Sequence, residues 1–231
     1  MLIGGLQKTS LLDYPNKVSS IIFTTGCNFR CGFCYNPELV TQIVKKNLIS
    51  EQQIFNFLNK RKKILDAVVI TGGEPTMHKD LPRFIAAIKE IGFLVKLDTN
   101  GTNPLMLKKL IKQGLIDYIA MDIKAPLRKY SKVVNIKIDT KLIKNSIKAI
   151  MNSGLGYEFR STVLPALHTK EDLVAMSKMI SGAKRYFLQK FVPSAKMIDP
   201  QFRQLRGFSD KEMKQLALAC KQHVDKVQVR G

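Results

Sequence analysis

Three cysteines in one short stretch are the residues of this chain best suited to chemistry. Cys27, Cys31 and Cys34 are spaced C-x3-C-x2-C, directly after an apolar run over 18–23, and are three of the four cysteines present. Three thiolates on one loop can hold three corners of a [4Fe–4S] cluster and leave the fourth iron without a protein ligand. Because electron-transfer clusters of this kind commonly use four cysteines, an open iron indicates a cluster that binds a further molecule.

A structural zinc site and a disulfide framework are the alternatives for these cysteines. Zinc commonly takes four ligands from paired cysteines or histidines, whereas Cys220 is distant in sequence and the histidines are scattered singly. A chain of 231 residues can bury a core without disulfides. We therefore predict that Cys27, Cys31 and Cys34 are metal ligands, and we interpret Cys220, on an apolar helical stripe, as a buried small side chain.

Composition predicts one domain over residues 1–231, because 45% hydrophobic residues in a chain of this length suit a single core. No apolar run approaches the ~20 residues of a membrane helix. The amino terminus lacks the basic-then-apolar order of a signal peptide. Since thiols that hold a cluster require a reducing compartment, we expect a cytoplasmic protein without membrane contact.

The net charge of +20, from 38 basic and 18 acidic residues, is compatible with an anionic partner or with solvated helix faces. The basic residues run through the whole chain without an arginine-rich tract. Dispersed lysine favours the second interpretation, and we therefore expect no nucleic-acid partner.

Apolar runs alternate with amphipathic segments along the chain. Strands are predicted at 18–24, 67–71, 94–98, 118–122, 157–164, 186–191 and 227–230. Helices are predicted from 50 through 65 and over 81–91, 105–113, 141–152, 169–180 and 209–223, three of them opening with capping boxes at Ser50, Thr169 and Ser209. This alternation indicates parallel β–α–β units. The units are too few for an eight-fold barrel, so the predicted fold is α/β: a partial, laterally open (β/α)6 TIM-like barrel with parallel strands.

Polar residues follow the first four of these strands where each one ends. They are the cysteine loop, Thr71-Gly-Gly-Glu-Pro75, Asp98-Thr-Asn-Gly101 and Asp122-Ile-Lys-Ala-Pro126, and Arg160 lies within the fifth strand. In parallel α/β barrels the active site lies at the carboxyl ends of the strands. The sequence therefore predicts a site there.

The cysteine motif, with Phe33 before its last cysteine, and the Gly-Gly-Glu-Pro sequence at 72–75 resemble the radical S-adenosylmethionine (SAM) superfamily. Stretches at 5–15, 188–193 and 227–231 extend the resemblance to the activating proteins of anaerobic ribonucleoside-triphosphate reductase, which are relatives of the pyruvate formate-lyase activating enzyme. This resemblance implies a [4Fe–4S] cluster whose open iron chelates SAM.

The resemblance also implies a set of cofactor-binding residues: Phe33, Gly72, Gly73, Glu74, Asp98, Lys124 and Arg160. Two glycines would let backbone carbonyls approach the methionyl ammonium, and the glutamate would accept its charge-assisted hydrogen bond. Asp98 would lie near the amino end of SAM, and Lys124 and Arg160 near its carboxylate. For these last three, ion pairs at the barrel mouth are an open alternative.

The implied activity is that of a radical SAM oxidoreductase. The reduced cluster would cleave SAM to a 5′-deoxyadenosyl radical, which would abstract hydrogen from a glycine of a glycyl-radical enzyme, here the anaerobic ribonucleotide reductase, with flavodoxin or ferredoxin as the one-electron donor. Two alternatives stay open: a radical SAM enzyme that modifies RNA or a purine-derived small molecule, and a non-catalytic iron–sulfur redox module.

Overall fold

A computed structural model describes the backbone of residues 1–231 and every side chain except that of Lys45. The chain divides into two compact units. The first contains Met1–Asn28 and Asn36–Ile119, and the second contains Phe29–Tyr35 and Ala120–Gly231. The cysteine loop thus contributes Cys27 to the first unit and Cys31 and Cys34 to the second. A single domain over residues 1–231 stays a prediction.

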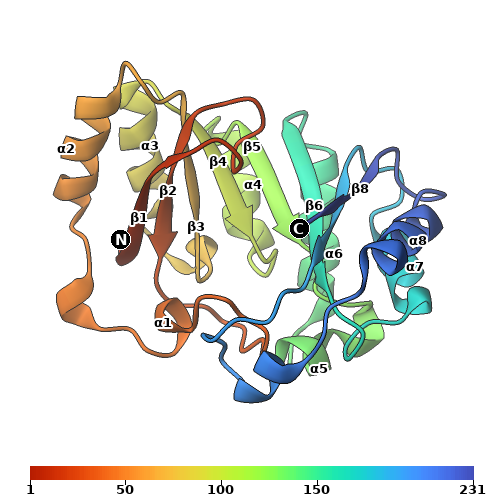
Figure 1. Ribbon diagram of the computed structural model, residues 1–231. Helices are drawn as coiled ribbons and strands as arrows, with labels where there is room; N and C mark the ends of the chain where they lie inside the picture. The colour runs from red at the N-terminus through yellow and green to blue at the C-terminus, as the bar shows by residue number, and fades with distance from the viewer. The chain divides into compact units, whose positions relative to one another are not determined.

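The first unit is built on β1–β4 and four helices (Figure 1). β1 (Ile3–Ser10) pairs antiparallel with β2 (Ser19–Thr24), and β2, β3 (Ala67–Gly72) and β4 (Leu94–Thr99) pair in parallel. The helices are α1 (Pro37–Val40), α2 (Glu51–Arg61), α3 (Leu81–Ile91) and α4 (Pro104–Lys112). Short 3₁₀ turns cover Lys45–Asn47 and Pro75–Met77. Residues 67–70 of β3 are all buried, as expected for a parallel strand covered on both faces.

The second unit repeats the β–α order. β6 (Gly156–Val163), β7 (Tyr186–Lys190) and β8 (Val227–Arg230) pair in parallel, and β5 (Tyr118–Asp122) carries the chain from the first unit into the second. The helices are α5 (Tyr130–Val134), α6 (Thr140–Met151), α7 (Lys170–Met179) and α8 (Asp210–Cys220), with 3₁₀ turns at Leu127–Lys129 and Pro200–Gln204. In Figure 1, α7 and α8 lie side by side, and α8 packs on β7 and β8.

The predicted fold class is confirmed. The strand order follows the chain from β1 to β8, as a mixed and open eight-stranded sheet. Each of the seven predicted strands is present, and β5 has the predicted bounds. All three predicted capping boxes are formed, at the amino ends of α2, α7 and α8.

Several features depart from the sequence prediction. α1 and α5 were not predicted, and α8 ends at Cys220 and not at residue 223. β1 was missed, because it is an edge strand whose central residues are partly exposed and therefore lack an apolar signal. Gly4 in this strand has no room for a side chain, since a Cβ there would lie 2.5 Å from a methyl of Leu39. The predicted helix through Leu65 was also wrong at its end: α2 stops at Arg61, and Leu65 is buried from the following connection.

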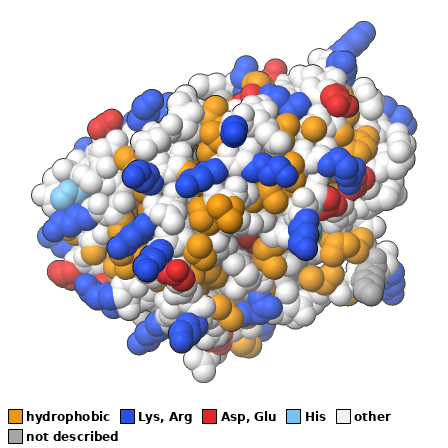
Figure 2. Space-filling model, turned by 180° about the vertical axis from the view of Figure 1, so that it is seen from behind, with side chains coloured by type: hydrophobic (Ala, Val, Ile, Leu, Met, Phe, Trp, Pro, Cys, Tyr) orange, Lys and Arg blue, Asp and Glu red, His pale blue; other side chains and the backbone are white. Residues whose placement is uncertain are grey.

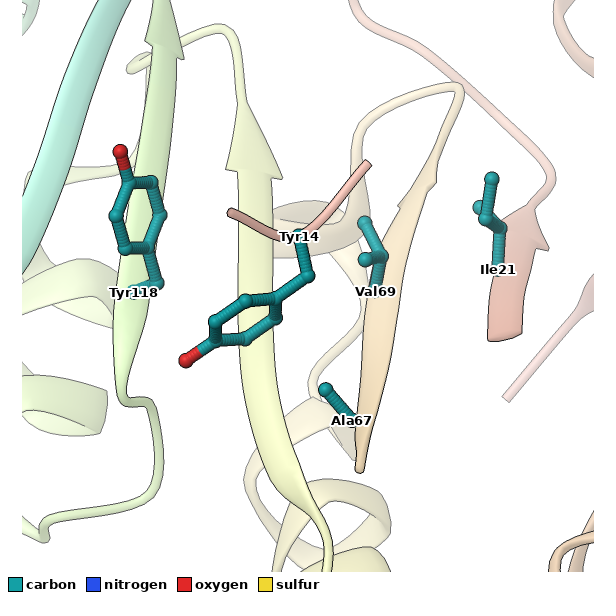
Figure 3. Packing of buried hydrophobic residues seen from close by; sticks show 5 residues of the cluster. All are labelled: Tyr14, Ile21, Ala67, Val69 and Tyr118. Carbon is teal, nitrogen blue, oxygen red and sulfur yellow. The ribbon is translucent and has the colours of Figure 1, made fainter. Parts of the chain in front are cut away.

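One cluster of buried side chains packs against the strands of the first unit (Figure 3). It consists of Tyr14, Ile21, Ala67, Val69 and Tyr118. Tyr14, from the connection between β1 and β2, lies between Val69 of β3 and Tyr118 of β5, with 5.7 Å between the two tyrosine ring centroids. Burial, and secondarily the carboxylate of Asp117, raises the pKa of Tyr14 to about 12. Tyr14 therefore anchors the connection to the core, although Leu11 and Leu12 of the same connection are exposed.

Along the part of the chain that the structure describes, no helix is both long and apolar enough to cross a membrane.

Candidate functional site

The two glycines after β3 are needed for packing within the first unit. A Cβ on Gly73 would lie 1.9 Å from the carbonyl oxygen of Gly26, and one on Gly72 would lie 2.4 Å from backbone atoms of Thr24. Gly72 also has a φ of +119°, which favours glycine. The backbone amides of Gly73 and Glu74 donate to the carbonyls of Thr24 and Gly26, at 2.9 and 2.7 Å. The pair therefore clamps the β3 turn onto the residues that precede Cys27.

Glu74 is a buried hub that joins the ends of β3 and β4. Glu74 is only 1% exposed. Oε1 accepts from the amide and hydroxyl of Thr76 and from the hydroxyl of Thr99, and Oε2 accepts from the amide of Asn100 at 2.6 Å. Burial raises the pKa of Glu74, and these hydrogen bonds oppose the rise. With four donors already on the carboxylate, Glu74 is placed to fix the two loops.

Asp98 at the end of β4 is bound by Lys96 of the same strand. The Lys96 ammonium lies 2.7 Å from Oδ1 of Asp98, and Lys96 is only 1% exposed. Residues two apart on a strand point to the same face, which explains why the pair forms. Any ligand that binds Asp98 must share it with Lys96.

Asn100, the residue after β4, contacts Cys27, the first cysteine of the motif. Asn100 donates from Nδ2 to Sγ of Cys27 at 3.9 Å and to Oδ1 of Asn28 at 2.9 Å. Nearby, Nε2 of His78 lies 2.9 Å from the carbonyl oxygen of Thr25. Of the sequence-predicted residues, Gly73 and Glu74 thus contact the backbone that precedes Cys27, whereas Asp98 lies in β4 and contacts Lys96.

The remaining two cysteines lie on a tight turn of the second unit. The amide of Cys34 donates to the carbonyl of Cys31 at 3.1 Å. Gly32 between them packs on Phe202, since a Cβ there would lie 2.5 Å from the ring. Phe33 is buried, with its ring centroid 6.0 Å from that of Phe202. The structure therefore gives Phe33 a packing contact that holds the turn.

Two cations, Lys124 after β5 and Arg160 within β6, share one carboxylate in the same unit. Asp122 binds Nζ of Lys124 at 2.9 Å and Nε of Arg160 at 3.0 Å. Burial alone would raise the pKa of Asp122, but Lys124 and Arg160 lower it to about 2. Burial would lower the pKa of Lys124, but Asp122 and then Cys31 raise it above its ordinary value. Lys124 is therefore a cation, and its ammonium also lies 6.0 Å from the Phe33 ring centroid.

Lys124 is held from both sides of its backbone. The hydroxyl of Tyr130 accepts from its amide at 3.3 Å, and Nε2 of His168 lies 2.9 Å from its carbonyl oxygen. A carbonyl can only accept, so Nε2 carries the proton and Nδ1 accepts from the amide of Leu164 at 3.4 Å. Burial lowers the pKa of His168, which favours this neutral form. The second unit thus brings together Phe33, Lys124 and Arg160 of the predicted set.

Sequence reasoning missed Asn100, Asp122 and His168 as site residues. Asn100 and Asp122 stood within the strand-end motifs that were singled out, and the position of each after a buried strand was the signal available. For His168 the local signal was its position after the fifth predicted strand, but its partner Lys124 is 44 residues away in sequence and could not be inferred.

The donor set fits an iron–sulfur cluster chemically. Cys27 accepts an amide N–H, and Cys31 interacts with the Lys124 ammonium, and both surroundings favour a thiolate. Among the described side chains, no group of three or more Cys, His, Asp or Glu stands in metal-holding geometry. Ligation by Cys27, Cys31 and Cys34 and the roles of the SAM-binding set stay predictions. Cys220 lies buried on α8, with its Sγ 3.5 Å from the carbonyl of Leu173, and burial raises its pKa to about 11.

Comparison with known proteins adds the family. The model of the Radical SAM superfamily matches residues 21–180. A Methanocaldococcus jannaschii protein, named provisionally as a glycyl-radical enzyme activating enzyme, is 36% identical over 99% of this chain and 95% of its own length. The pyruvate formate-lyase-activating enzyme of Clostridium pasteurianum is 24% identical over 83% of this chain and 81% of its own.

A solved structure shows the same fold. Streptococcus suis SuiB bound to S-adenosylmethionine superimposes with a TM-score of 0.70 at 15% identity, over 91% of this chain and 50% of SuiB. The chain therefore spans half the length of SuiB, and the likeness concerns the fold. The predicted cofactors, a [4Fe–4S] cluster and SAM, are those of the matched superfamily. By its family match and its full-length relative, this chain belongs to the radical SAM superfamily and to its glycyl-radical enzyme activating enzymes.

Proposed function

We propose that this enzyme abstracts a hydrogen atom from a glycine Cα of a partner protein, the anaerobic ribonucleotide reductase. The observation that carries the proposal is the 36% identity over 99% of the chain to a relative named for activating glycyl-radical enzymes. The stretches at 5–15, 188–193 and 227–231 narrow the partner to the reductase by resemblance. Flavodoxin or ferredoxin is the proposed one-electron donor.

Residues of both units have separate tasks in this proposal. Cys27, Cys31 and Cys34 would hold the cluster. Lys124 and Arg160 would provide positive charge for the SAM carboxylate, while Asp122 keeps both side chains in place and lowers the cost of burying them. When bound and reduced, the cluster would supply the one electron needed to cleave SAM at its C5′–S bond, with methionine as the leaving group, so that hydrogen taken from glycine would yield 5′-deoxyadenosine and a glycyl radical.

The structure changes the proposed roles of two predicted residues. Glu74 has four donors from its own chain, so we assign it to positioning the Asn100 loop and not to direct contact with the SAM ammonium. Gly73 is the second residue, and we assign it to packing, because the carbonyl of Gly26 leaves no room for a side chain at this position. For the methionyl ammonium of SAM, the proposed contacts are the backbone carbonyls of the turn after β3.

The proposed partner is tested by electron paramagnetic resonance. The anaerobically reconstituted enzyme, dithionite, SAM and the candidate reductase should together give a glycyl-radical signal, with 5′-deoxyadenosine formed in step. Cys31→Ala is the matched negative control. Deoxyadenosine formed without the signal would contradict the partner, and tight RNA binding in that case would favour the RNA-modifying alternative. We propose a cytoplasmic location, since a thiolate-held cluster requires a reducing compartment.

A further inference from the structure

Three polar side chains next to Cys27 form a closed ring of hydrogen bonds. Nδ2 of Asn100 donates to Oδ1 of Asn28 at 2.9 Å, and Nδ2 of Asn28 donates to Oγ1 of Thr102 at 2.8 Å. The hydroxyl of Thr102 then donates to Oδ1 of Asn100 at 2.7 Å, which closes the ring. Asn100 itself is only 6% exposed. The ring therefore leaves its three members little freedom to rotate.

A backbone amide settles which way the Asn100 side chain faces. The amide of Thr102 donates to Oδ1 of Asn100 at 3.0 Å. Because an N–H can only donate, the oxygen of the carboxamide must lie on that side, and the NH₂ group must lie on the other. One proton of that group goes to Asn28, and the other is directed at Sγ of Cys27, 3.9 Å away.

The backbone of Asn100 is fixed as firmly as its side chain. Its amide donates to Oε2 of Glu74 at 2.6 Å, and Glu74 is in turn held by the hydroxyls of Thr76 and Thr99. The buried carboxylate thus anchors the loop, and the ring orients the carboxamide. Asn100 is a preorganised N–H donor aimed at one sulfur.

We propose that Asn100 is a positioning residue that tunes the cluster, by donating an N–H···S hydrogen bond to the Cys27 thiolate and so raising the reduction potential. This inference rests on the proposed ligation by Cys27. Hydrogen bonds to the sulfurs help to set the potentials of iron–sulfur clusters. A donor stabilises the more negative, reduced state more than the oxidised state, because the thiolate then carries more charge. Glu74 acts on the cluster through Asn100.

The test is a redox titration of the cluster, followed by the electron paramagnetic resonance signal of its reduced form, on wild type, Asn100→Ala and Asn100→Asp. No SAM and no partner protein are present. At the solution potential where wild type is half reduced, the ratio of reduced to oxidised cluster in Asn100→Ala should fall about tenfold, equivalent to 59 mV for one electron. Asn100→Asp keeps the acceptor for Thr102 but replaces the donor by a negative charge, so its ratio should fall further.

Asn103→Ala is the matched control. Asn103 lies in the same loop, caps α4 and donates to the carbonyl of Thr76 at 2.8 Å, without a hydrogen bond to sulfur in the structure. It should lose stability and keep the wild-type potential. If Asn100→Ala does not retain its cluster, the nearly isosteric Asn100→Asp decides the result.

Wild-type potentials in Asn100 variants with full cluster content would overturn the inference, as would an equal shift in Asn103→Ala. Since the titration contains no partner, failure to form a glycyl radical would contradict the proposed function and leave this result unchanged. Conversely, an unshifted potential beside a normal glycyl radical would remove only the role of Asn100.

Discussion

At the scale of single residues, the surroundings of Cys27 and Cys31 differ from those of Cys220. Cys27 and Cys31 lie beside an N–H donor and an ammonium, respectively, both of which stabilise a thiolate. Cys220 lies in an apolar site that raises its pKa to about 11, so it is a thiol at neutral pH. The polar neighbours of Cys27 and Cys31 thus distinguish these two residues from Cys220.

The cysteine variants test this difference. Replacing Cys27, Cys31 or Cys34 with Ala should remove the cluster and abolish SAM cleavage, because two thiolates cannot hold the cubane against loss of iron. Cys220→Ala should keep iron content and turnover, at a cost of about 1 kcal/mol from the lost volume. Iron analysis and 5′-deoxyadenosine formation measure both. An essential Cys220 beside a dispensable Cys34 would contradict the assignment.

Gly73 gives a second prediction at this scale. A methyl group there would meet the carbonyl of Gly26, next to Cys27, at 1.9 Å, so the backbone must move. Gly73→Ala should lower the free energy of unfolding by about 1–3 kcal/mol and reduce the iron bound per chain.

Gly5→Ala in the same unit is the control, because its Cβ would meet its nearest neighbour at an ordinary 3.5 Å. Denaturant unfolding and iron analysis compare the two variants. Equal iron content and equal free energies of unfolding in Gly73→Ala and Gly5→Ala would show that the close contact of Gly73 with Gly26 does not stabilise the fold.

At the scale of elements, side chains at strand ends connect neighbouring strands within each unit. Glu74 joins the ends of β3 and β4, and Asp122, at the end of β5, binds Arg160 within β6. The carboxyl end of β8 is tied in the same way, since Arg230 makes two hydrogen bonds to the buried Glu158 of β6 and stacks on Phe187 of β7. These links hold strand ends in place within each unit.

The Asp122 link predicts a pH dependence. The folded-state pKa of about 2 lies below the ordinary value of 3.8, so the stabilisation is complete above about pH 4 and is lost as the pH falls towards 2. Asp122→Asn should therefore unfold more easily than wild type by about 2 kcal/mol at pH 6, and this difference should shrink below pH 4.

Urea unfolding of the cluster-free proteins between pH 3 and 7 measures this difference directly. Asp225→Asn, an exposed carboxylate on the same unit, is the matched control. A gap between wild type and Asp122→Asn that is absent at pH 6, or that grows on acidification, would contradict the ion-pair account.

At the scale of the whole molecule, the net charge of +20 is the property that no single site explains. Figure 2 shows Lys and Arg side chains dispersed over the visible face, with apolar and uncharged surface between them. A dispersed pattern raises the general attraction for anions without forming a groove. It is consistent with the interpretation of the charge as solvated surface.

The charge predicts weak and salt-sensitive binding to nucleic acids. Affinity for a random RNA or DNA duplex should fall steeply with the logarithm of the salt concentration, because the binding releases counterions. Fluorescence anisotropy from 50 to 300 mM salt measures the slope. Binding to one RNA that survives physiological salt would support the RNA-modifying alternative instead.

Local features of this protein could be predicted from its sequence. They are the spacing of Cys27, Cys31 and Cys34, the period of the strands and helices, and the capping boxes. Each of these features depends on residues only a few positions apart, so a short segment is enough to predict it. Gly72 and Gly73 were likewise singled out from a turn after a strand; the structure gives both a packing role, and their contact with SAM stays a prediction. An edge strand such as β1 has a weaker pattern, and it was found only in the structure.

Which polar group binds which depends on the tertiary structure. Glu74 accepts hydrogen bonds from Thr99 and Asn100, which lie more than 20 residues away in sequence. Likewise, Asp122 forms its ion pair with Arg160 because β6 places Arg160 next to it. Asn100 donates to Cys27 because the loops that carry these two residues lie side by side. Hydrogen bonds require atoms within a few tenths of an ångström, and that precision comes from the packing of strands distant in sequence.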